Sequence, residues 1–105
     1  MDYQLVLQFP ARNDEETERL VALEDDLIER LEDSADVDGH DPDGKLMNFF
    51  VTTRDAEESF ERIRSLLEDK GLLEAVVAAY RHVDEDDYTL LWPEDDKERK
   101  FKFPD

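Results

Sequence analysis

The sequence contains no cysteine and has few basic residues. Without cysteine the chain has no disulfide bonds, no thiolate catalysis and no cysteine-ligated zinc. Lysine and arginine total 13 against 31 aspartates and glutamates, which gives a formal net charge of −18. Because nucleic acids and anionic membranes would repel such a surface, we expect neither as a partner and expect a basic protein instead. Halophilic adaptation is an alternative source of the same acidity.

Long apolar runs are also missing, since none approaches the 18 residues that indicate a membrane span. The first residues lack the basic and apolar regions of a secretory signal, so we expect a cytoplasmic protein. A length of 105 residues fits one domain. Because the apolar residues are periodic, we expect residues 1–93 to fold as that domain and the charged residues 94–105 to form a mobile tail.

Two segments have the three- and four-residue apolar spacing of amphipathic helices. Asn13 and Asp55 precede them as expected N-terminal caps, each with a glutamate three residues later. The two apolar stripes consist of Leu20, Leu23, Leu27 and Leu31, with Val21 and Ile28 flanking, and of Ala56, Phe60, Ile63 and Leu67, with Leu66 beside them. Gly71 is expected to stop the second helix.

Five segments are predicted as strands: residues 3–9, 35–38, 46–53, 74–83 and 88–92. Residues 74–83 also fit a helix by propensity, but Gly71 before them and the aromatic strand after them favour a strand. Residues 39–44 are expected to form a turn. This order predicts an α+β fold, a two-layer ferredoxin-like sandwich (βαββαβ plus a C-terminal strand). Both helices would cover one face of a mainly antiparallel sheet of order 5-4-1-3-2.

Nearly the whole chain apart from its tail resembles a family of small, acidic bacterial proteins without an assigned activity. The most distinctive matches are Val-Asp-Gly-His-Asp at residues 37–41 and Asp-Tyr-Thr-Leu-Leu-Trp-Pro at residues 87–93. After His40 this chain departs from the glycine-, serine- and glutamate-rich pattern of similar chains. The resemblance implies a ferredoxin-like plait and no particular chemistry.

A cluster of aspartates around His40 is the first candidate site. Its members are Asp36, Asp38, His40, Asp41 and Asp43. Oxygen-rich loops bind hard cations, and histidine adds affinity for transition metals. An EF-hand frame fails here because its first and twelfth positions fall on Ser34 and Lys45. His40 with a carboxylate also suits general acid–base catalysis, but no nucleophile or oxyanion site accompanies it. A hydrated turn rich in aspartate and glycine is the simpler interpretation, and no cofactor is indicated.

The second candidate is the sheet face opposite the helices, which a two-layer fold leaves uncovered. Strand alternation places Gln4, Val6, Gln8, Asn48, Phe50 and Thr52 on it. An exposed aromatic among amides suits a homodimer contact or a ligand platform. A partly solvated face without any partner is the alternative.

The third candidate is an acidic rim formed by Asp84, Glu85, Asp86 and Asp87 in the loop before the last strand. Such charge runs are commonly only solvated loops, but they also suit a basic partner. We therefore expect a non-catalytic, cytoplasmic interaction or regulatory module, for example an immunity- or antitoxin-like inhibitor of a basic toxin. The rival is a small metal-binding protein or acid–base enzyme that uses His40 and its aspartates. A nucleic-acid mimic is a third hypothesis.

Overall fold

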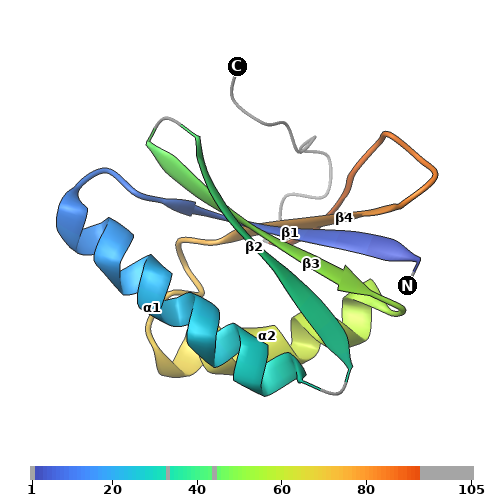
Figure 1. Cartoon of the computed structure of the whole chain (residues 1–105), viewed down its shortest axis with the longest axis horizontal. Coiled ribbons are helices and arrows are strands. Elements are labelled where there is room, and N and C mark those ends of the chain that lie inside the picture. Colours follow the sequence, from blue (N-terminus) through green and yellow to red (C-terminus); the bar gives the residue numbers. More distant parts are fainter. Residues whose placement is uncertain (1, 33, 44, 93–105) are drawn as a thin grey trace.

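Two helices lie on one face of a five-stranded antiparallel sheet (Figure 1). The computed structural model describes residues 2–32, 34–43 and 45–92. Its elements are β1 (Tyr3–Pro10), α1 (Asp14–Leu31), β2 (Ala35–Asp43), β3 (Leu46–Thr53), α2 (Ala56–Asp69), β4 (Val77–His82) and β5 (Thr89–Trp92). The strand order β2-β3-β1-β4-β5 is the predicted order read from the other edge. The predicted tail, residues 94–105, lies outside the described residues.

The core fills the space between the helices and the sheet, as the apolar stripes predict. The four leucines of the α1 stripe, the four residues of the α2 stripe and Leu66 are buried, whereas the flanking Val21 and Ile28 are exposed. The buried residues pack against the side chains of β1 and β3 that face them, among which Leu5, Phe9, Phe49 and Val51 are at most 1% exposed. Neither helix in the described part of the chain is long and apolar enough to span a membrane.

Both helix starts and the end of α2 follow the sequence signals. The side chains of Asn13 and Asp55 accept hydrogen bonds from the backbone N–H groups of Glu16 and Glu58. After α2, Gly71 adopts a positive φ of 71° and donates to the carbonyl of Glu68, while Leu72 donates to that of Leu67. This is the Schellman arrangement, which satisfies the last carbonyls of the helix and turns the chain toward β4.

The predicted turn over residues 39–44 is wrong for residues 39–43, because β2 continues to Asp43, and residue 44 lies outside the described residues. The register shifts between Val37 and Gly39, and Gly39 has a φ of 121°. A bulge of this kind leaves one residue, Asp38, without a partner on β3 and lets the strand continue pairing. The glycine therefore marks a bulge in a long edge strand rather than a turn that ends a short one.

Of the ambiguous residues 74–83, Val77–His82 form a strand, β4, as preferred from the sequence, while residues 74 and 75 lie in a turn before it. This strand pairs with β1 on one side and with β5 on the other. The helix-like run of alanines and valines is thus overridden by its position in the sheet, where Ala78 and Ala79 are both fully buried. Residues 84–87 form the predicted loop between the two strands, and β5 begins at Thr89, one residue later than expected.

Candidate functional site

Tyr3 lies at the point where three chain segments meet at one end of the sheet. Its backbone pairs with Thr53, the last residue of β3, and on the other side with His82, the last residue of β4. The chain leaves β3 there to begin α2, and it leaves β4 there to form the acidic loop. The antiparallel register therefore places the start of α2 and the loop on either side of Tyr3.

The first turn of α2 is fixed to the end of β3 by a hydroxyl cluster. The side chain of Thr53 lies 2.7 Å from the hydroxyl of Ser59 (between their Oγ atoms), and both residues are buried. Thr53 Oγ1 also accepts from the backbone N–H of Asp55 at 3.2 Å. These bonds hold Asp55 and the exposed Glu57 at a defined position beside the sheet.

Arg81 fixes the acidic loop in the same way. One terminal guanidinium nitrogen donates to the carbonyls of Val83 and Glu85, at 3.1 and 2.8 Å. Its Nε donates to Gln4 Oε1, which also accepts from the hydroxyl of Tyr88. The loop is thereby tied to β1 by a side chain that satisfies several backbone acceptors, so the positions of its carboxylates are restricted.

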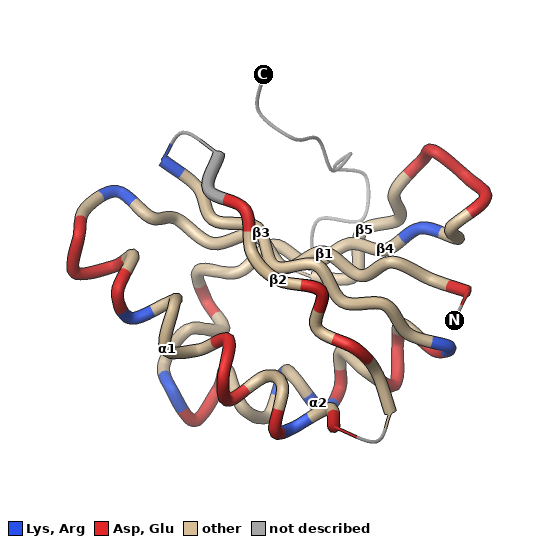
Figure 2. Tube along the Cα trace, in the orientation of Figure 1, with Lys and Arg blue, Asp and Glu red and all other residues tan. Residues whose placement is uncertain are grey.

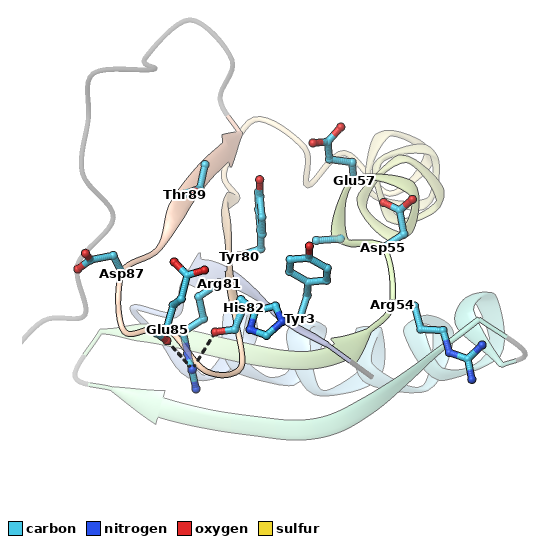
Figure 3. A pocket seen from close by; sticks show the side chains of 11 residues that line it. Tyr3, Arg54, Asp55, Glu57, Tyr80, Arg81, His82, Glu85, Asp87 and Thr89 are labelled. Atoms are coloured by element: carbon cyan, nitrogen blue, oxygen red, sulfur yellow. Dashed lines mark hydrogen bonds between the residues drawn. The ribbon is translucent and has the colours of Figure 1, made fainter.

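Between the loop and α2 lies an open hollow of about 450 Å³ (Figure 3). Its lining comes from β1, β4, the acidic loop, β5 and the start of α2, and consists of Tyr3, Arg54, Asp55, Ala56, Glu57, Tyr80, Arg81, His82, Glu85, Asp87 and Thr89. Tyr3 and Tyr80 stand between Glu57 on the α2 side and Glu85 on the loop side. Residues distant in sequence thus surround one space.

The aromatic rings of the hollow stand nearly perpendicular to one another. The centroids of Tyr3 and Tyr80 are 5.9 Å apart with an interplanar angle of 70°, and those of Tyr3 and His82 are 5.4 Å apart at 86°. In such edge-to-face pairs the ring that offers its edge keeps both of its faces clear of the other ring. All three side chains are only partly buried, so the group is accessible to a ligand.

The charge around the hollow is predominantly negative. Four carboxylates and two guanidinium groups line it, with one carboxylate each from Asp55, Glu57, Glu85 and Asp87. Arg81 is engaged by backbone carbonyls, and Arg54 points away from the centre of the hollow (Figure 3). Asp84 and Asp86 lie in the same loop and are exposed, which adds negative charge nearby (Figure 2).

The structure separates His40 from the aspartates next to it in sequence. Nδ1 of His40 lies 2.7 Å from a carboxylate oxygen of Glu24 on α1, and its ring packs near Phe49. Asp38 instead accepts a hydrogen bond from the hydroxyl of Thr52. Asp36 pairs with Thr52 in the β2–β3 register, and Asp41 pairs with Asn48, two positions on the opposite face of β3 from Phe49. Among the described residues no group of three or more potential ligands could hold a metal ion.

The sheet face opposite the helices is only partly accessible, so the expectation of an uncovered face is wrong for half of its residues. Val6 is fully buried, while Gln8 and Asn48 are 8% and 2% exposed and share a hydrogen bond of 3.1 Å. Val6 packs with Ala79, and Phe50, Val77 and Tyr88 pack around this pair. Gln4, Phe50 and Thr52 remain partly buried.

Of the sequence-predicted candidates, the structure brings only Glu85 and Asp87 of the acidic rim to the hollow. The other lining residues, among them Tyr3, Tyr80 and Glu57, were not predicted as site residues from the sequence. The predicted order 5-4-1-3-2 contained the necessary signal, because it pairs the start of β1 with the end of β4. Comparison of the chain with models of protein families, with curated proteins and with solved structures found no match.

Proposed function

We propose that this chain is a non-catalytic, cytoplasmic module that binds a basic protein through its acidic surface. One observation carries the proposal: carboxylates of the loop and of the first turn of α2 surround the same hollow. Glu57, Glu85 and Asp87 are exposed, so they keep their charge available to a partner. A concentrated negative field of this kind accelerates the encounter with a positively charged protein.

Observations on the two other candidates favour the acidic hollow. His40 is engaged by Glu24 on the helix side of the sheet, away from Asp38, which the Thr52 hydroxyl contacts. The burial of Val6 and Asn48 also withdraws these side chains from a contact surface, which weakens the case for a homodimer through the sheet face. The acidic hollow is the candidate that keeps both accessibility and a defined geometry.

The fold itself has a finer interpretation. We propose a ferredoxin-like plait extended by β5, because the βαββαβ order and the central pair β1 and β3 match that arrangement. The relationship to the family of small acidic bacterial proteins stays a prediction. An experimental structure in which β1 and β3 are not neighbours would contradict the plait.

Fluorescence anisotropy with a labelled peptide of lysine, arginine and glycine tests the function. We expect binding at low salt that weakens at high salt. The variant Glu57→Gln/Glu85→Gln/Asp87→Asn should bind about tenfold more weakly, because three exposed ion pairs at about 0.5 kcal/mol each amount to about 1.5 kcal/mol.

A matched control removes the same charge from α1. The variant Glu18→Gln/Asp25→Asn/Glu29→Gln neutralises three exposed carboxylates that do not line the hollow. It should lose clearly less affinity than the first variant. Equal losses in the two variants would show that only net charge matters, and absence of peptide binding at any salt concentration would refute the proposed function.

A further inference from the structure

We infer that the hollow beside Tyr3 and Tyr80 receives one cationic side chain, a lysine or an arginine, of the basic partner. The inference rests on the proposed function and adds the chemistry of its recognition. Its basis is the cavity and the aromatic rings that line it, two observations that are independent of the net charge of the chain. Tyr80 packs against the core, and its ring also lines the hollow together with those of Tyr3 and His82.

The hollow is large enough to admit a cationic side chain. Its volume of about 450 Å³ lies within the range of small-ligand sites. The hollow is open to the surface and is lined by residues of the loop and of the start of α2 (Figure 3). The two sides of the hollow are fixed, because Arg81 ties the loop and Thr53 ties the helix start.

The aromatic rings suit a cation. The face of an aromatic ring carries negative charge density and attracts lysine or arginine within about 6 Å of its centroid. Tyr3 and Tyr80 meet at 70°, so a charged group in their corner can contact a ring face and a phenol hydroxyl. Nδ1 of His82 accepts a hydrogen bond from the backbone N–H of Asp84. This bond orients the imidazole, which forms a further side of the hollow.

The carboxylates of the hollow favour a cationic ligand over an anionic one. Glu57 and Glu85 stand on opposite sides of the two tyrosines, and Asp55 and Asp87 complete the lining. The positive end of the α2 dipole opposes a cation at this place. That effect is offset by Asp55, which caps the helix, and by Glu57 and Glu58 in its first turn. An anionic ligand would meet four carboxylates in the same space and is disfavoured.

Protein-observed NMR titration with a single-cation probe tests the inference. The probe is a capped glycine pentapeptide with one central arginine, and its matched control carries citrulline, which keeps the planar group and removes the charge. We expect the arginine probe to shift the ring signals of Tyr3 and Tyr80 and the citrulline probe not to do so. A lysine version of the probe shows which cation the hollow prefers.

Ring substitutions separate the tyrosine contacts from general electrostatics. Tyr80→Leu should weaken the arginine probe about fivefold, since one cation–π contact is worth about 1 kcal/mol. Tyr80→Phe keeps the ring face and should lose less than twofold. Tyr3→Leu provides a second, independent variant if Tyr80→Leu does not fold, as judged by circular dichroism.

The outcomes distinguish the hollow from the wider proposal. Suppose that binding of the lysine- and arginine-rich peptide depends on Glu57, Glu85 and Asp87, but the tyrosine variants bind it as tightly as wild type. The inference about the hollow is then refuted, and the proposed function is supported. If that peptide does not bind, but the arginine probe binds and loses affinity in Tyr80→Leu, the inference about the hollow is supported and the proposed function is refuted. Binding of neither probe refutes both.

Discussion

Nδ1 of His40 lies 2.7 Å from a carboxylate oxygen of Glu24, and this contact joins the edge strand β2 to α1. The His40 ring is also 5.9 Å from that of Phe49, a fully buried core residue. The bulge at Asp38 and Gly39 turns His40 toward the helix side of the sheet. The histidine that stood out most in the sequence is therefore an exposed residue on the helix side of the edge strand, in contact with Glu24.

Replacing His40 should affect stability and leave binding unchanged. We expect His40→Ala to lower the free energy of unfolding by about 1 kcal/mol or less, the usual range for a partly exposed pair. Urea denaturation measures this loss. The control Asp41→Ala changes an exposed side chain of the same strand and should be neutral. A zinc titration or a turnover that disappears in His40→Ala would support the rival metal site or enzyme.

Gln8 and Asn48 share a buried hydrogen bond, and replacing only one of them should lower the free energy of unfolding. Asn48→Ala leaves the Gln8 amide without this partner in a buried place, so we expect a loss of about 1–3 kcal/mol in the free energy of unfolding. The double variant Gln8→Leu/Asn48→Leu removes both polar groups and should lose less than the two single leucine variants together. Strictly additive losses in urea denaturation would contradict this coupling.

The left-handed backbone conformation at residue 71 should by itself favour glycine over other residues. Gly71 has a φ of 71°, and a Cβ atom added there would meet no other atom within 4 Å. Gly71→Ala should therefore lower the free energy of unfolding by about 1–2 kcal/mol, the cost of the left-handed region for an L-residue. Gly71→Asn is the control, because asparagine tolerates this region better and should lose less. Equal stability of all three proteins would contradict the Schellman ending of α2.

The stability of the chain should depend on pH through Glu16. Its carboxylate accepts hydrogen bonds from the Arg12 side chain at 2.9 and 3.0 Å and from the Arg12 backbone N–H at 3.1 Å. These bonds, with the side-chain contact foremost, lower the pKa of Glu16 and raise that of Arg12. Because the pKa of Glu16 is lower in the folded state, its contribution is present above the ordinary value of 4.5 and is lost as the pH falls through the folded pKa.

We therefore expect wild type to exceed Glu16→Gln in the free energy of unfolding at neutral pH. The difference should shrink below a pH of about 4.5, the ordinary pKa of the group. Urea denaturation over a pH series measures it. Glu18→Gln, an exposed neighbour on the same helix, is the control. A difference that grows on acidification would contradict the assignment.

The sequence predicts the elements and their order because local signals and tertiary packing agree in most of this chain. The stripe through Leu20, Leu23, Leu27 and Leu31 gives both the helix and its buried face. The caps at Asn13 and Asp55 fix where the helices begin. Alternation along β1 and β3 identifies the sides of the sheet correctly, since Leu5 and Phe49 face the helices and Val6 and Phe50 do not.

The sequence could not predict what depends on nonlocal neighbours. Gly39 is typical of turns, yet pairing with β3 holds it in a bulge. Val6 and Asn48 are placed on the correct side, but their burial depends on the residues that pack around them. The hollow is formed by side chains from β1, β4, β5, the acidic loop and α2. Tyr3, Tyr80 and Glu57 are far apart in the sequence, and only the folded chain brings them to one space.

The most direct test of binding through the acidic hollow is a map of the chemical shifts that the lysine- and arginine-rich peptide changes. We predict that the largest changes fall on the rings of Tyr3 and Tyr80, on the backbone N–H of Glu57 and on residues 83–89. Those signals should return to their starting positions at high salt, since exposed ion pairs are screened. Largest changes on α1 or on β2, with the start of α2 unchanged, would contradict the account.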